Sequence, residues 1–205
     1  MKIISVSGVD GAGKSTFIRE VREMLQQQAP AASVGTAWLR FNPRASPAAS
    51  GNSVVSTLDS AHKGHPIKRV ARRLGCSSLW VWANTRLYRR QLAWQLASRT
   101  DIEILLVDRF TLDFIADNVG SGLLSATRVG SVTSSLPTAD VAFVLTVSDA
   151  DLAVRKDPRE DLSGLKRRRD LYLQLAGCLD LPIVDTTTSD WQADVLANLR
   201  SSGVL

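Results

Sequence analysis

The residues that decide the fold run Gly8-Val9-Asp10-Gly11-Ala12-Gly13-Lys14-Ser15-Thr16. This stretch has the form GxxxxGK[ST], in which glycines let successive backbone N–H groups point inward around phosphate oxygens. The lysine brings a positive charge to the β and γ phosphates, and the serine hydroxyl is placed to bind Mg²⁺. The motif therefore predicts a nucleoside triphosphate site formed by Gly8, Asp10, Gly11, Ala12, Gly13, Lys14, Ser15 and Thr16.

The flanking residues give this motif the setting that it needs. Residues 2–7 (KIISVS) are a short β-branched run, which predicts a buried strand leading directly into the glycines. After the motif, a helix is predicted from Ser15 to Gln28, because Phe17, Ile18, Val21 and Leu25 recur at helical spacing. The order strand, Gly-rich loop, helix is the context in which this motif binds phosphate.

Strand and helix patterns alternate along the rest of the chain. Further strands are predicted at 34–40, 103–107, 141–147 and 182–185, and helices at about 78–98, 111–118, 122–135, 149–155, 165–179 and 190–200. Such alternation favours a parallel sheet with helices on both faces. We therefore predict one α/β domain over residues 1–205, with a long loop at 42–66 that is rich in Ser, Ala, Gly and Pro.

Composition excludes several classes of protein. The chain has 205 residues and a net charge of +5, which suits an anionic small substrate as well as nucleic acid. The basic stretches 68–73 and 166–169 lack interleaved aromatic residues, so nucleic-acid binding is not expected. Cys76 and Cys178 are far apart and predict two buried thiols rather than a disulfide or zinc site. No signal peptide or membrane span is predicted, so we expect a cytoplasmic protein.

The motif is shared by kinases, GTPases and larger ATPases, and the rest of the sequence separates these classes. A small GTPase would carry an NKxD-type segment that reads guanine, but Asn84 is followed by Thr85-Arg86-Leu87 and no Asn-Lys pair occurs. The chain is also too short for most motor-type ATPases. These observations favour an ATP-dependent kinase that acts on a small substrate.

Seven segments in order resemble the thymidylate kinase family, and together they cover nearly the whole chain. The first is GVDGAGKST, and the pair Asp108-Arg109 within LLVDRF resembles the family's DRY or DRF motif. The remaining five are individually weaker: RFNP (40–43), WANTRLYRR (82–90), LPTADVAFVLTV (136–147), RRRDLYLQLA (167–176) and PIVDTT (182–187). The resemblance implies a three-layer P-loop kinase fold with a five-stranded parallel sheet and a lid.

The resemblance also implies the activity and the residues that perform it. The family transfers the γ-phosphoryl group of ATP, with Mg²⁺, to a nucleoside monophosphate such as dTMP. Ser15 and Asp108 would hold the metal, and Asp10, Arg40, Arg86 and Arg109 would bind the acceptor, with Arg109 also catalytic. Arginine suits these positions because its planar fork can grip a phosphate through two N–H groups.

A lid is expected at about 155–164, where the sequence carries several charged residues. One subtype of the family places a catalytic arginine in the phosphate-binding loop and another places it in the lid. Position 11 is glycine and the loop has no arginine, so Arg155 or Arg159 is the candidate that would act with Lys14. Lid closure would also exclude water from the transferring phosphoryl group.

The departures from the family fall on the acceptor side. Asp113 stands where serine is expected, and Asp117 replaces an aromatic residue, so both carboxylates are candidate substrate contacts. RFNP also lacks the acidic residue of the family's R-E-P-G segment. These changes leave open a diverged kinase that acts on a modified nucleoside, a sugar phosphate or a biosynthetic intermediate.

Two further alternatives concern turnover and assembly. A nucleotide-dependent regulatory protein without turnover would have lost Lys14, Asp108 or the lid cations, and none is lost. The family resemblance suggests a homodimer, with the helix at 78–98 as a candidate interface.

Overall fold

The structure is a computed structural model, and it describes residues 1–39, 77–155, 157 and 161–205. A five-stranded parallel sheet has the strand order β2-β3-β1-β4-β5, which confirms the predicted α/β fold. The strands are β1 (Lys2–Ser7), β2 (Val34–Trp38), β3 (Ile104–Asp108), β4 (Val141–Thr146) and β5 (Ile183–Asp185). The helices are α1 (Lys14–Gln28), α3 (Ser77–Ala97), α4 (Thr111–Gly120), η3 (Ala126–Arg128), α5 (Val129–Thr133), α6 (Asp149–Arg155), α7 (Leu162–Leu179) and α8 (Trp191–Ser201).

The central strands are buried because helices cover both faces of the sheet. Ile4 and Val6 of β1 and Leu105, Leu106 and Val107 of β3 are fully buried. Their nearly continuous apolar sequence is typical of parallel strands that pack on two sides. In the register of the sheet Val6 lies beside Asp108, so β1 and β3 end at the same edge.

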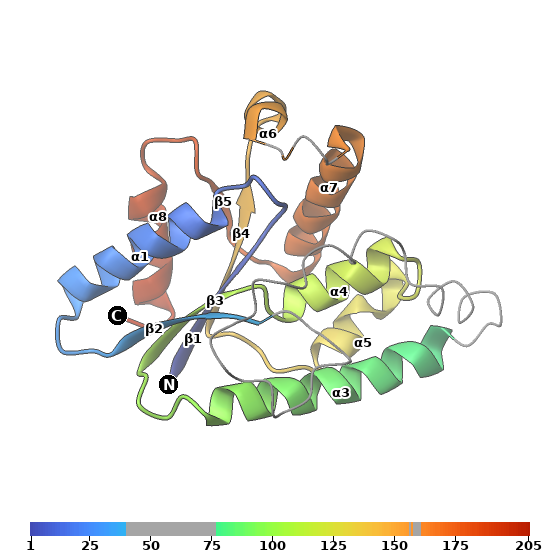
Figure 1. Cartoon of the computed structure of the whole chain (residues 1–205), viewed down its shortest axis with the longest axis horizontal. Helices are drawn as coiled ribbons and strands as arrows, with labels where there is room; N and C mark the ends of the chain where they lie inside the picture. The colour runs from blue at the N-terminus through green and yellow to red at the C-terminus, as the bar shows by residue number, and fades with distance from the viewer. Residues whose placement is uncertain (40–76, 156, 158–160) are drawn as a thin grey trace.

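Aromatic contacts tie the helices to the sheet and to each other. On one side Phe17 of α1 packs against Phe143 of β4 and Trp191 of α8, with ring centroids 5.6 and 5.0 Å away. On the other side Tyr88 of α3 stacks on Phe114 of α4 at 4.7 Å. Figure 1 shows α1 and α8 together on one side of the sheet and α4, α5 and α7 on the other.

Strand order fixes where a ligand can bind. The chain leaves β1 toward α1 on one face, whereas β3 leads to α4 on the other, and β1 lies between β3 and β4. In open parallel sheets the crevice at the carboxyl ends of the strands, where the order reverses, is the usual ligand site. Here that edge carries the Gly-rich loop after β1 and the Asp108-Arg109 pair after β3.

Some sequence expectations differ from the structure. The helix predicted at 122–135 is divided into a turn, η3 and the short α5. Asn118 O accepts from both Leu123 N and Leu124 N, and Gly122 has φ +68°. Residues 122–124 therefore form the turn that ends α4 instead of starting a new helix. Cys178 is exposed rather than buried. Cys76, the loop at 42–66 and the basic stretch 68–73 lie outside the described residues. Among the described helices, none combines the length and apolar character needed to cross a bilayer.

Candidate active site

The Gly-rich loop adopts a tight path that its glycines permit. Gly11 and Gly13 have φ values of +87° and +84°, a left-handed region that other residues rarely adopt. A Cβ atom on Gly8 would lie 2.9 Å from the carbonyl oxygen of Leu145 in β4, so any side chain at that position would displace backbone. Gly13 is the N-cap of α1, which places the positive end of that helix at the loop.

Lys14 lies inside this loop. Its side chain is 8% exposed, and Nζ donates to the carbonyl oxygens of Gly8 at 2.9 Å and Val9 at 2.8 Å. Nζ also lies 3.3 Å from Asp10 Oδ1. The ammonium group is therefore held by the loop's own oxygens at the first residue of α1. Ser15 and Thr16 are exposed on the first turn of α1, beside the lysine.

Asp108 is the last residue of β3, and one of its two carboxylate oxygens has an unusual environment. Its Oδ1 atom is buried and finds no hydrogen-bond partner within the described part of the chain. Burial raises the pKa of Asp108 above its usual value, although the charges of Lys14 and Arg109 counteract part of the rise. A carboxylate oxygen of this kind is a ligand that Mg²⁺ accepts.

The surroundings of Asp108 fit Mg²⁺ better than a metal held wholly by protein. No group of three or more His, Cys, Asp or Glu residues that could hold a metal occurs among the described residues. Mg²⁺ usually takes one or two protein oxygens and completes its shell with water and substrate phosphates. Asp108 and Ser15, the two residues named from the sequence, are the ones that would supply those protein oxygens.

Arg109 and Asp10 form an ion pair across the site. Arg109 Nη2 lies 2.6 Å from Asp10 Oδ1, and the arginine side chain is 13% exposed. Burial alone would raise the pKa of Asp10, but the charges of Lys14 and Arg109 outweigh it and hold the pKa below its usual value. Arg109 has φ +66°, a conformation that costs free energy for any residue other than glycine. The pair thus fixes a strained arginine beside the phosphate-binding loop.

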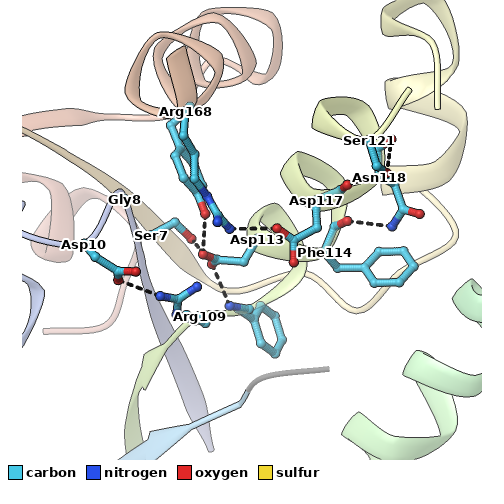
Figure 2. Close-up of polar contacts among 12 residues, drawn as sticks. Ser7, Gly8, Asp10, Arg109, Asp113, Phe114, Asp117, Asn118, Ser121 and Arg168 are labelled. Atoms are coloured by element: carbon cyan, nitrogen blue, oxygen red, sulfur yellow. Dashed lines mark hydrogen bonds and ion pairs between the residues drawn. The ribbon is translucent and has the colours of Figure 1, made fainter. Parts of the chain in front are cut away.

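Asp113 is buried and fully engaged by protein donors. Its Oδ2 accepts from Ser7 Oγ at 2.6 Å and from Phe110 N at 3.1 Å, and its Oδ1 accepts from Tyr172 OH at 2.6 Å. Figure 2 shows these three bonds meeting at one carboxylate. Because both oxygens are occupied, the geometry favours a positioning role for Asp113 rather than the substrate contact expected from sequence.

Asp117 lies one helical turn beyond Asp113. Its side chain is 46% exposed, and Oδ1 accepts from Arg168 Nη2 at 2.7 Å. The guanidinium of Arg168 also lies 5.9 Å from the ring centroid of Tyr172. Of the two carboxylates predicted on the acceptor side, Asp117 is therefore the one that faces solvent.

The predicted arginines differ in where the structure places them. Arg155 lies against the Gly-rich loop, since a Cβ on Gly11 would be 3.7 Å from Arg155 Cβ and a Cβ on Gly13 would be 3.8 Å from its Nη1. Arg86 lies on the exposed face of α3, 5.9 Å from the ring centroid of Trp82, and the described contacts do not bring it to Lys14 or the Asp108-Arg109 pair. Arg40 and Arg159 lie outside the described residues.

Sequence reasoning missed three residues of this site, Ser7, Tyr172 and Thr186, and it favoured an exposed helix face over a phosphate site for the run 166–169, which contains Arg168. Ser7 and Tyr172 bond Asp113, and Arg168 bonds Asp117. Thr186, after β5, donates through Oγ1 to Ala12 O at 3.4 Å and so lies against the Gly-rich loop. One signal was available: 113 and 117, like 168 and 172, are four positions apart on predicted helices, a spacing that places each pair on one face.

Comparisons with known proteins bear on the fold. No family model matches the chain, and no curated protein matches it. Among solved structures, thymidylate kinase from Ehrlichia chaffeensis is similar with a TM-score of 0.52 and 15% sequence identity, over 99% of this chain and 97% of that chain. At this identity the likeness shows the fold alone. The chain therefore has a fold like that of thymidylate kinase, as the sequence resemblance implied.

Proposed function

We propose that this protein is an ATP- and Mg²⁺-dependent kinase that transfers the γ-phosphoryl group to a small phosphorylated acceptor. A nucleoside monophosphate such as dTMP is the first candidate. The observation that carries the proposal is the position of Lys14, which is buried inside the Gly-rich loop and bonded to its carbonyl oxygens. The Asp10–Arg109 pair and Arg155 lie beside the same loop.

The site residues would divide the work of phosphoryl transfer between them. The loop N–H groups and Lys14 would hold the β and γ phosphates, since little covalent chemistry is asked of the protein and positioning with charge stabilisation dominates. Mg²⁺, when bound through Ser15 and Asp108, would neutralise charge on the same oxygens. Arg109 would bind the acceptor phosphate, and Arg155 would lie over the transferring group from the lid side.

A second candidate keeps the ATP half and changes the acceptor. The ion pair between Asp117 and Arg168 stands where the resemblance leads one to expect an aromatic residue. Polar groups that lie on the acceptor side suit an acceptor rich in hydroxyl or phosphate groups better than a stacked base. A sugar phosphate, a modified nucleoside or another biosynthetic intermediate is therefore the alternative.

Formation of ADP from Mg·ATP with a panel of nucleosides, nucleoside monophosphates and sugar phosphates tests the proposal. Lys14→Ala should abolish turnover, whereas Lys2→Ala should leave it unchanged, because Lys2 pairs with Asp140 at the opposite end of β1. Turnover of dTMP supports the first candidate, and turnover of another acceptor without dTMP supports the second. ATP binding without phosphoryl transfer to any acceptor would instead support a nucleotide-dependent regulatory protein.

A further inference from the structure

Two helices face each other across the acceptor side of the site through matched residues. Asp113 and Asp117 lie one turn apart on α4, and Tyr172 and Arg168 lie one turn apart on α7. Tyr172 bonds Asp113, and Arg168 bonds Asp117. The two helices therefore run in opposite directions at this contact. The inner bond is buried, whereas the outer ion pair is partly exposed.

Arg168 belongs to the electrostatic surroundings of the reaction site. Its positive charge helps to lower the pKa of Asp10 in the Gly-rich loop, and it opposes the charge of Arg109. Asp113 is the carboxylate that interacts with both arginines, and Figure 2 shows it between them. Hydrogen bonds link the two arginines through Asp113, whose Oδ2 accepts from Phe110 N, next to Arg109, and whose Oδ1 accepts from Tyr172, one turn from Arg168. Arg168 therefore adds a positive charge on the α7 side of Asp113, where the acceptor would bind.

The ion pair between Arg168 and Asp117 is partly exposed to solvent. The side chains of Arg168 and Asp117 are 34% and 46% exposed, and an ion pair this open contributes little to stability. A phosphate dianion can accept two parallel N–H bonds from one guanidinium, which makes it a stronger partner than a single carboxylate oxygen. Asp113 is not exchangeable in the same way, because three protein donors hold it.

We propose that Arg168 is an anion-binding residue of the acceptor site, which binds the phosphomonoester group of the acceptor in exchange for its ion pair with Asp117. This inference rests on the proposed kinase function and deepens its acceptor side. Asp117 is then the counter-ion that Arg168 keeps until a phosphate displaces it. An acceptor without a dianionic group does not displace the carboxylate, so the pair selects phosphorylated acceptors over their unphosphorylated forms.

Inorganic phosphate is the probe for this site, once the loop is filled by a nucleotide. The protein is first saturated with Mg·ADP, which occupies the phosphate-binding loop, and phosphate is then titrated by calorimetry at constant ionic strength. Arg168→Gln should weaken phosphate binding at least about tenfold, as expected for loss of a charge-assisted bidentate contact. Arg167→Gln is the matched control, because Arg167 neighbours it on α7, is 76% exposed and lies 3.8 Å from Asp161.

Two further variants separate ligand binding from a structural role. Asp117→Asn removes the competing carboxylate and should tighten phosphate binding several-fold. Arg168→Lys keeps the charge but not the planar fork and should give an intermediate affinity. Thermal denaturation of each variant with Mg·ADP bound shows that it is folded.

The outcomes distinguish this inference from the function on which it rests. Failure of wild-type protein to bind Mg·ADP overturns both the proposed kinase and the role of Arg168. Normal binding of Mg·ADP with no phosphate binding, or with equal phosphate affinity in the Arg168→Gln and Arg167→Gln variants, overturns the role of Arg168 alone. Weaker phosphate binding in Asp117→Asn would likewise show that the ion pair is structural.

Discussion

The guanidinium of Arg109 lies 2.6 Å from Asp10 Oδ1, although 99 positions separate the two residues in sequence. The bond joins the end of β3 to the Gly-rich loop after β1, across two strands that pair in the sheet. Arg109 makes this contact from a backbone with φ +66°. Such strain persists where surrounding structure imposes it, and it is concentrated at functional sites.

The strain at Arg109 predicts a difference between two substitutions that remove the same guanidinium. Arg109→Gly should be about 1 kcal/mol more stable than Arg109→Ala, because glycine adopts a positive φ without the clash that a Cβ atom causes. Both variants should lose phosphoryl transfer about equally, by roughly a hundredfold. Urea denaturation gives the stabilities, and initial rates with Mg·ATP give the activities.

Equal stability of the two Arg109 variants would show that the backbone at this position is not strained. Unequal activity would show that the backbone conformation, and not only the guanidinium, contributes to catalysis.

Replacing Asp108 by asparagine should raise stability and lower activity. Asp108→Asn should stabilise the protein without ligands by about 1 kcal/mol at neutral pH, because it removes a buried charged oxygen that has no partner among the described residues. The same substitution should strongly reduce Mg²⁺-dependent turnover, since it removes the predicted metal ligand. Thermal denaturation and a Mg²⁺ titration of the initial rate measure the two effects.

The stability difference between wild type and Asp108→Asn should depend on pH with a definite sign. Burial raises the pKa of Asp108 in the folded state above its usual value of 3.8. The wild type is therefore most stable relative to the variant below pH 3.8, where the carboxyl is protonated in both the folded and the unfolded state. Its stability falls as pH rises from that value through the raised pKa of the folded state. The amide of the variant does not titrate, so the advantage of the variant should vanish in acid; a pH-independent advantage contradicts this account.

If Arg155 acts on the transferring phosphoryl group, its loss should change kcat rather than the KM for ATP. Arg155→Ala should lower kcat by about a thousandfold, as loss of a transition-state arginine does, with little change in the KM for ATP. Arg19→Ala, which removes a 66% exposed arginine from α1, should leave both constants unchanged. A higher KM for the acceptor with unchanged kcat would assign Arg155 to acceptor binding instead.

Much of the fold followed from the sequence because its signals are local. The motif from Gly8 to Thr16 and the apolar runs of the strands depend on neighbouring residues, and they predicted the five parallel strands that the structure contains. The prediction of one helix at 122–135 was wrong, and the reason is also local. Gly122, with its positive φ, and the bonds from Leu123 and Leu124 back to α4 place residues 122–124 in a turn, so helical structure begins only at Ala126.

The site was less predictable because its contacts join distant segments. Asp113 could be singled out as a departure from the family, but its three donors come from β1, from Phe110 at the N-cap of α4 and from α7. Nothing near position 113 in the sequence shows that Tyr172, 59 positions away, would occupy one of its oxygens. Burial and hydrogen bonding in the folded chain thus occupy both oxygens of a residue that the sequence offered as a substrate contact.

The bond between Tyr172 and Asp113 predicts a large coupling free energy. Tyr172 is 1% exposed, and its hydroxyl donates to Asp113 Oδ1 at 2.6 Å. Burial raises the pKa of Tyr172, so the hydroxyl keeps its proton and remains a donor throughout the working pH range. Tyr172→Phe should therefore cost about 1–3 kcal/mol of stability, because it leaves a buried carboxylate oxygen without its donor.

A double-mutant cycle with Asp113→Asn measures this coupling. The two substitutions together should cost less than the sum of the single costs, with an interaction of about 1–2 kcal/mol. The surface pair Lys2 and Asp140, with side chains 46% and 32% exposed, provides the control cycle and should couple by less than about 1 kcal/mol. Additive costs at Asp113 and Tyr172 would mean that the carboxylate is held by Ser7 and Phe110 N alone. In that case Tyr172 of α7 would not help, through Asp113, to position Ser7 at the end of β1, where the Gly-rich loop begins.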